Sequence, residues 1–198
     1  MGERLILDRR GASAAEFALV LPLLILLLLG IIDVGRYMWT LNRAEKAAQM
    51  GVRMAVVTDY VSSAVNANYI GVSCSGSPAL SAGDPVPAGC FTTITCSRTA
   101  ATATCTSGTA NTTAFNRVLS RMEAIYPEIA ARNLQVIYSD SGVGYAGNPN
   151  GPDVAPLVTV QLSGMQFQPI TLFSLATVSL PAIHSSLTFE DGIGSQSN

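Results

Sequence analysis

The residues whose types could do chemistry here are one histidine, four cysteines and a glutamate at the start of an apolar run. His184 is the only histidine among 198 residues. A single histidine removes most Ser-His-Asp, Cys-His and multi-histidine zinc arrangements. We therefore expect no catalytic site, no cofactor and no metal site in this chain.

All four cysteines lie between Cys74 and Cys105. An even set in a Ser/Thr/Gly-rich region beyond an apolar segment indicates disulfides formed outside the cytosol. Of the three possible pairings we predict Cys74–Cys90 and Cys96–Cys105, within a disulfide loop over 72–108. Zinc bound by all four would need close Cys-x-x-Cys pairs, and these cysteines are spaced more widely.

A literal G-x-G-x-x-G runs from Gly142 to Gly147, after an expected strand. Dinucleotide binding needs a helix directly behind this pattern, and Asn148-Pro149-Asn150-Gly151-Pro152 cannot open one. Calcium ligands could come from four residues of the loop: Asp140, Asn148, Asn150 and Asp153. A polar turn is the simpler interpretation.

Glu16 stands directly before the most apolar stretch of the chain. The 16 residues from Phe17 to Ile32 contain no charged or polar side chain. A bilayer core needs about 20 mostly apolar residues in a helix, so the segment spans a membrane only if it includes Glu16. A carboxylate there is costly and is a functional candidate by default, although the helix dipole also favours an acid at a helix start.

A leader with three arginines precedes the apolar run, as in a secretory signal peptide. No small-x-small cleavage site follows the run, so we expect the apolar helix to be retained. Cations on both sides of the run leave the positive-inside rule undecided. The cysteines favour a single-pass protein with the N-terminus inside and the C-terminal domain outside the cytosol.

The helical pattern continues beyond Asp33. We predict one helix from about Ala14 to Val57, about 66 Å long at 1.5 Å per residue, with a membrane segment over 14–35. Tyr37 and Trp39 would mark the membrane–water boundary. Pro22 lies inside the apolar part, where it either kinks the helix or is tolerated.

Small residues form one face of the upper half of this helix: Ala44, Ala47, Ala48, Gly51 and Ala55. Such a face lets another helix approach closely. It could dock on a neighbouring subunit or, more simply, on the chain's own globular domain.

The distal chain predicts a small α+β head over 58–198. Two β-rich runs near 91–96 and 102–106 could form a hairpin. A second helix is expected over 113–126, capped by Asn111 or Thr112 and ended by Pro127. About three antiparallel strands are expected: 134–138, 157–162 and 183–189.

An apolar connector, Met165–Leu180, joins the last two of these strands. If exposed it would be an interaction surface; packing under the sheet is the simpler account. Charged residues make up only 12% of the chain and the net charge is −2. So few cations cannot form a basic patch, which argues against a nucleic-acid partner.

The string Arg10–Leu24, RGASAAEFALVLPLL, resembles the TadE/TadG group of Tad (Flp) pilus assembly proteins. Within it, Gly11–Phe17 resembles the processing site of type IV prepilins and pseudopilins. The segments Ile31–Arg36 and Ala44–Ala55 match the group's pattern as well. The resemblance implies a pilin-like fold and a leader, residues 1–11, that a prepilin peptidase removes between Gly11 and Ala12.

The resemblance also implies a structural function, as a minor pilin or pseudopilin of a Tad-type (type IVc) pilus or secretion apparatus. Glu16, as fifth mature residue, would act with Phe17 and Pro22 in subunit assembly and register. Partners would be the peptidase, other pilins, the inner-membrane assembly platform and the bilayer. The protein would lie in the inner membrane with a cytoplasmic N-terminus and a periplasmic C-terminal domain, and would be extracellular after assembly into a pilus.

Three alternatives remain open. The protein could be an uncleaved, signal-anchored periplasmic binding or adhesion module. It could be a membrane-anchored enzyme, which the single histidine disfavours. It could also be a tip adhesin whose ligand surface is the loop over 61–111.

Overall fold

The computed structural model describes residues 12–74, 76, 78–171 and 176–190. These residues form two compact units. The first contains residues 12–40 and 166–179, and the second, called the head below, contains residues 41–165 and 180–190.

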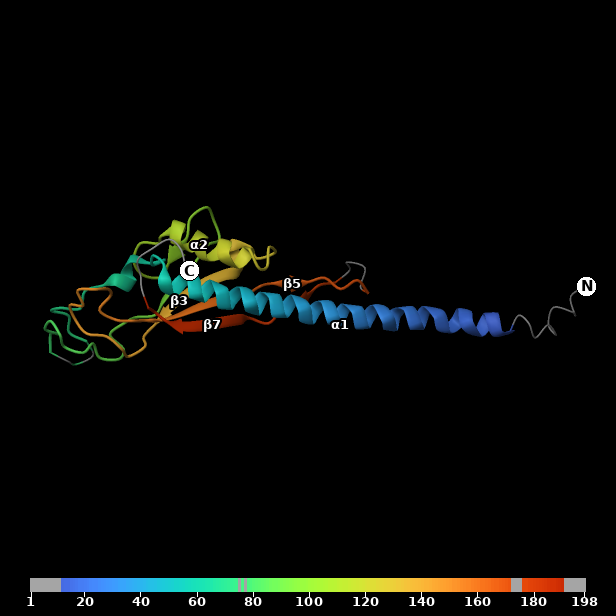
Figure 1. Ribbon diagram of the computed structural model, residues 1–198, viewed down its shortest axis with the longest axis horizontal. Helices are drawn as coiled ribbons and strands as arrows, with labels where there is room; N and C mark the ends of the chain where they lie inside the picture. Colours follow the sequence, from blue (N-terminus) through green and yellow to red (C-terminus); the bar gives the residue numbers. More distant parts are fainter. Residues whose placement is uncertain (1–11, 75, 77, 172–175, 191–198) are drawn as a thin grey trace, which may run out of the picture. The chain divides into compact units, whose positions relative to one another are not determined.

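Helix α1 spans Ala12–Val57, 46 residues, and continues through Pro22 without a break (Figure 1). The long helix predicted from the sequence is therefore confirmed. Within the described part of the chain, this is the one helix long and apolar enough to cross a membrane. Such a helix is compatible with a single-pass membrane anchor.

The head is built on a five-stranded sheet in the order β2-β1-β3-β4-β7, with every neighbouring pair antiparallel. The strands are β1 Ile94–Ser97, β2 Thr104–Cys105, β3 Leu134–Ser139, β4 Leu157–Leu162 and β7 Ile183–Thr188. Short 3-10 helices η1 (Ser63–Asn66) and η2 (Ala131–Asn133) lie in the connections. The three predicted strands are confirmed as β3, β4 and β7. The predicted hairpin is formed by β1 and β2, and it joins the same sheet because β1 pairs with β3.

One face of this sheet carries the core. Strands β3 and β4 bury every second residue, because successive side chains of a strand point to opposite faces. The inward residues are completely inaccessible to solvent: Leu134, Val136, Tyr138, Val158, Val160 and Leu162. The Tyr138 hydroxyl accepts a hydrogen bond from the Val61 amide, 3.1 Å away, and burial raises the pKa of this phenol to about 12.

Helix α2, Thr112–Glu123, covers part of the same face. The side chain of Asn111 accepts a hydrogen bond from the Ala114 amide, which confirms the predicted N-cap. The helix ends at Glu123, three residues before the predicted end at Tyr126. Pro127 disfavours the helical conformation of the residue before it, and the amide of Ile125 already bonds the carbonyl of Met122, three residues back.

The small-residue face of α1 packs inside the head. Ala44, Ala47 and Ala48 are fully buried, and Ala55 is 2% exposed. A Cβ added at Gly51 would lie 2.6 Å from the Met122 sulfur and 3.3 Å from Val160 Cγ1. The close approach allowed by these residues therefore serves the chain's own α2 and β4, the simpler of the two sequence interpretations.

Polar contacts fix α1 and the chain after it to α2. The Arg43 guanidinium donates two hydrogen bonds to the Ile125 carbonyl, at 2.8 and 3.2 Å, and lies 5.2 Å from the centre of the Tyr126 ring. Asp59 and Arg117 form an ion pair at 2.6 Å. The first contact joins α1 to the residues that follow α2, and the second joins the residues that follow α1 to α2.

Both predicted disulfides are confirmed, Cys74–Cys90 and Cys96–Cys105. The second links residues that pair directly across β1 and β2. The edge strand β2 has only two residues, so this covalent link holds a pairing that few backbone hydrogen bonds support.

The connector after β4 was expected, in the simpler account, to pack under the sheet; its residues 166–179 instead belong to the unit that contains residues 12–40. It forms a separate two-stranded pair, β5 (Gln166–Phe167) with β6 (Val178–Ser179), which groups with residues 12–40 of α1. We call its described residues, 166–171 and 176–179, the membrane-side hairpin, because they share a unit with the candidate membrane span. Residues 172–175 of this connector lie outside the described residues.

Replacing Gly51 with leucine should destabilise the head by about 1–3 kcal/mol, because the new side chain enters space held by Met122 and Val160. Thermal or urea unfolding of the full chain in detergent measures this. Gly51→Ala is the matched control: its smaller clash is offset by higher helix propensity. Adding Met122→Ala should make the Gly51→Leu loss less than additive, and strict additivity would contradict the contact.

Candidate functional site

The N-terminal half of α1 exposes apolar side chains to its surroundings. Between Phe17 and Val34 most large residues are more than half exposed, with Leu19 at 81% and Leu23 at 71%. A soluble protein rarely leaves a continuous apolar surface of this size uncovered. The surface therefore needs lipid, another subunit, or both in turn.

Glu16 lies at the membrane-side end of this surface. It is exposed, and within the described residues its carboxylate has neither a hydrogen bond nor an ion pair. Phe17 is next to it and 62% exposed. Of the predicted processing residues, Ala12 is the first residue of α1 and Gly11 lies outside the described residues.

Asp33, by contrast, is almost completely satisfied by its own chain. One carboxylate oxygen accepts the Ile170 amide at 2.8 Å, and the other accepts the Thr171 amide and hydroxyl, each at 2.8 Å. Arg36, one turn later on α1, adds an ion pair at 3.1 Å. The carboxylate is thus the point where the membrane-side hairpin is attached to the helix.

Aromatic contacts strengthen this attachment. The Tyr37 and Phe167 rings meet edge to face, 5.5 Å between centroids and 82° between planes. The Arg36 guanidinium lies 5.2 Å from the centre of the same Phe167 ring. Tyr37, which the sequence predicts to mark the membrane–water boundary together with Trp39, is therefore partly covered by the hairpin, whereas Trp39 is 63% exposed.

The predicted site residues fall into two groups. Glu16, Phe17 and Pro22 lie on the exposed apolar half of α1. The predicted packing face is enclosed in the head: Ala44, Ala48, Gly51 and Ala55. Since the head already covers that face, the exposed half of α1 is the part of the helix that is open to contact with lipid or another chain.

The loop that carries the glycine pattern uses its acids to hold backbone. Asp153 accepts the amides of Tyr69 and Asn148, at 2.7 and 2.9 Å. Asp140 accepts the amides of Gly89 and Gly142, at 2.5 and 2.8 Å. Over the residues that the structure describes, no cluster of three metal-ligating side chains occurs.

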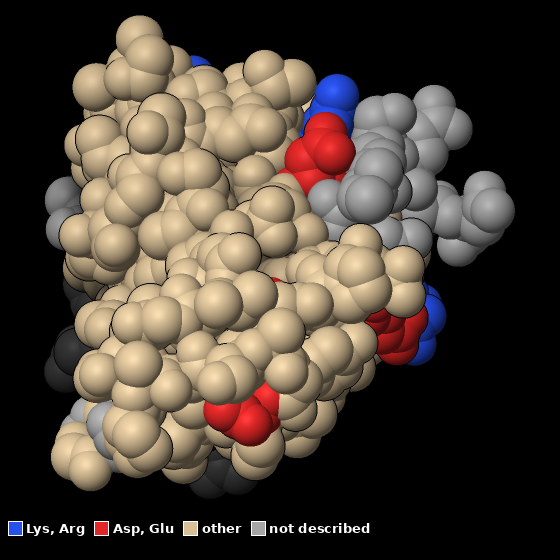
Figure 2. All heavy atoms as spheres, turned by 90° about the vertical axis from the view of Figure 1, so that its left-hand side faces the viewer, with Lys and Arg blue, Asp and Glu red and all other residues tan. Residues whose placement is uncertain are grey.

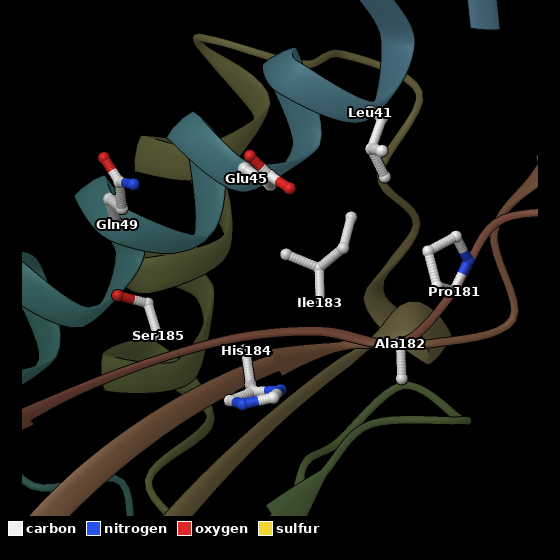
Figure 3. A pocket seen from close by; sticks show the side chains of 8 residues that line it. All are labelled: Leu41, Glu45, Gln49, Pro181, Ala182, Ile183, His184 and Ser185. Atoms are coloured by element: carbon white, nitrogen blue, oxygen red, sulfur yellow. The ribbon is translucent and has the colours of Figure 1, made fainter. Parts of the chain in front are cut away.

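A hollow of about 290 Å³ lies in the head between α1 and β7 (Figure 3). Ile183 points toward the helix that carries Leu41 and Glu45, and His184 points away from it. The histidine therefore does not meet Glu45, the acid that lines the hollow, and the residues drawn here form no acid–base pair.

Figure 2 shows the end of the head formed by loops near 61–91 and 140–155. Nearly all of this face is uncharged, and lysine and arginine atoms appear only at its margin. The composition, 12% charged residues, predicts such a surface. A nucleic-acid site needs a cluster of cations, and this face does not provide one.

This exposed apolar helix, with an acid at its start, is the part of the chain that matches a known protein family. Residues 11–53 match the TadE-like protein family. The resemblance predicted from the sequence is thereby confirmed over this part, the TadE-like segment. No curated protein and no solved structure matches the chain.

The TadE-like segment contains Glu16, Asp33 and Gly51 and ends before the membrane-side hairpin. Sequence reasoning singled out the first and third of these but missed Asp33 as a contact residue. A signal was present: an acid at the end of a long apolar run, with an arginine three residues later on the same helical face. Its hairpin partners, 137 and 138 positions away, gave no such signal.

Asp33→Asn and Asp33→Ala should release the hairpin from α1. The asparagine amide has one acceptor oxygen instead of two. Alanine has none, so it leaves the Ile170 amide and the Thr171 amide and hydroxyl without an acceptor. We expect the Ile170 and Thr171 amides to exchange with solvent about tenfold faster or more, measured by NMR on the full chain in detergent micelles. Arg36→Gln leaves both carboxylate oxygens of Asp33 in place and should change the exchange rates of these amides much less. Unchanged protection in Asp33→Ala would refute the attachment.

Proposed function

We propose that this protein is a minor pilin or pseudopilin of a Tad-type pilus or secretion apparatus. Its role is structural rather than catalytic, in filament assembly or initiation. The observation that carries the proposal is an acid, Glu16, without a partner in the described chain, at the start of an exposed, membrane-length helix within the TadE-like segment.

Maturation would begin with removal of the leader by a prepilin peptidase. Cleavage between Gly11 and Ala12 creates an α-ammonium group on the helix end that carries Glu16. The leader contains three cations and two anions, so its loss changes the net charge from −2 to −3. The new ammonium and Glu16 are four residues apart, within reach along one helix face.

In a filament the same two groups would pair between neighbouring subunits. Apolar helices packed together form a medium of low dielectric, where an unpaired carboxylate costs several kcal/mol. Only stacking positions that bring Glu16 to a free N-terminal amine avoid that cost. The charge would thus set axial register, while the exposed side chains between Phe17 and Val34 supply the contact area.

The proposed topology has the N-terminus in the cytoplasm and the head in the periplasm. Both disulfides lie in the head, and disulfides persist in the periplasm but not in the reducing cytosol. The partners in this proposal are the peptidase, other pilins and the assembly platform. Release of α1 from the bilayer into the filament would carry the head outside the cell.

N-terminal sequencing tests the maturation step. Coexpression with the apparatus's prepilin peptidase should give a membrane protein that begins at Ala12, and expression without the peptidase should give one that begins at Met1. Gly11→Leu should block the conversion because a bulky side chain would stand at the cleaved bond, whereas Gly2→Leu, in the same leader, should not. Native material that retains Met1 would identify a tethered periplasmic module instead.

Substitution of Glu16 tests the assembly step. Glu16→Ala and Glu16→Gln should reduce the protein in the sheared filament fraction at least about tenfold, since one unpaired buried charge costs more than 1.4 kcal/mol. The amount in the membrane and the cleavage should stay unchanged. Glu45→Ala, which removes the exposed acid that α1 carries on the head, is the matched control. Normal filaments from Glu16→Ala would exclude the register role.

A further inference from the structure

A groove of about 390 Å³ lies between α1 and the membrane-side hairpin, entirely within the first unit. Its wall is mainly apolar, with Gly30, Val34, Tyr37 and Met38 from the helix and Phe167, Pro169 and Val178 from the hairpin. Asp33 and Thr171, the polar members, are bonded to each other. The groove therefore offers hydrocarbon surface and few free polar groups.

The position of the groove along α1 places it at the edge of the proposed membrane segment. A bilayer core takes about 20 helical residues, so a span that begins at Ala14 ends near Asp33. Gly30 and Val34 then lie in its last turn, and Tyr37 and Met38 lie one turn beyond. The hairpin that bonds Asp33 must reach the same depth.

The hairpin is suited to that depth in its side chains. Ile170 and Val178 are each 43% exposed, next to Val34 at 61% and Met38 at 51% on the helix. Exposure of this apolar area to water is unfavourable. Moving it into contact with lipid chains lowers the free energy by about 25 cal/mol per Å².

Its polar groups are suited as well. Backbone at membrane depth is tolerated where its polar groups are satisfied within the protein. The amides of Ile170 and Thr171 bond Asp33, and the Thr177 hydroxyl bonds Gln166 at 2.8 Å. The Arg36 side chain, 44% exposed beside Asp33, lies where a cation can meet lipid phosphate.

We propose that the membrane-side hairpin lies at the membrane–water interface on the periplasmic side of the bilayer and that its groove holds the hydrocarbon chain of a phospholipid from that leaflet. The inference rests on the proposed insertion of α1 in the membrane. It adds a second membrane-contacting element, distant in sequence from the helix, and assigns Asp33 the task of keeping that element at the bilayer surface.

Tryptophan quenching by brominated phosphatidylcholine tests the proposal on the full chain in vesicles. In a Trp39→Phe background, Ile170→Trp and Val178→Trp place a reporter on either side of the hairpin. Val20→Trp, 58% exposed in native form, reports mid-span, and Leu187→Trp, 39% exposed in native form on β7, reports the head. Bromines near the headgroups should quench both hairpin reporters, deep bromines should quench Val20→Trp, and Leu187→Trp should keep its emission.

Each other result overturns a defined part of the proposal. Quenching of Val20→Trp without loss of emission from either hairpin reporter would remove the hairpin from the membrane and leave the anchor intact. No quenching of Val20→Trp would reject the anchor itself and, with it, the proposed function. Emission from Ile170→Trp that follows the protein-to-lipid ratio instead of the bromine position would assign the groove to a second copy of the chain.

Discussion

The constraint on which this structure depends is the placement of two acids, Glu16 and Asp33, at the two ends of the apolar stretch of α1. A carboxylate next to hydrocarbon must find donors, because its desolvation costs several kcal/mol otherwise. Asp33 finds three hydrogen bonds and an arginine within its own unit. Glu16 finds no partner in the described chain. Asp33 is thus committed to the fold of its own chain, whereas Glu16 is the acid for which we propose a partner on a neighbouring subunit.

The same helix meets different surroundings because its residues change size along its length. Large aliphatic side chains from Phe17 to Val34 present a wide apolar surface outward. From Ala44 to Ala55 the side chains on one face shrink to alanine and glycine, and the head closes over them until Gly51 touches Met122. Small residues bring backbones together and large ones cover area. The change in size therefore separates the part of α1 that builds the subunit from the part that contacts its surroundings.

What could be predicted from the sequence were the features set by local pattern. Helical periodicity gave α1 and α2, alternation gave β3, β4 and β7, and the capping preference of asparagine gave the start at Asn111. The disulfides followed because each pair is close in sequence. The hairpin of β5 and β6 could not be predicted, since its place depends on Asp33, 137 residues away from Ile170. The sequence pattern of an apolar stretch that contains a proline does not show whether the stretch packs under a sheet or beside a helix.

The described aspartates show how a chain with so few charges uses them. Asp33, Asp84, Asp140 and Asp153 each accept backbone amides, and Asp59 pairs with Arg117. Two of these link loops far apart in sequence, so the distal end of the head is held by carboxylates and disulfides where regular structure is sparse. Acids used in this way have their oxygens committed to the fold. Glu16 differs from all of them, because no turn or loop of the described chain approaches it. Its place at the start of the exposed apolar run is the basis on which we propose it as a contact between subunits.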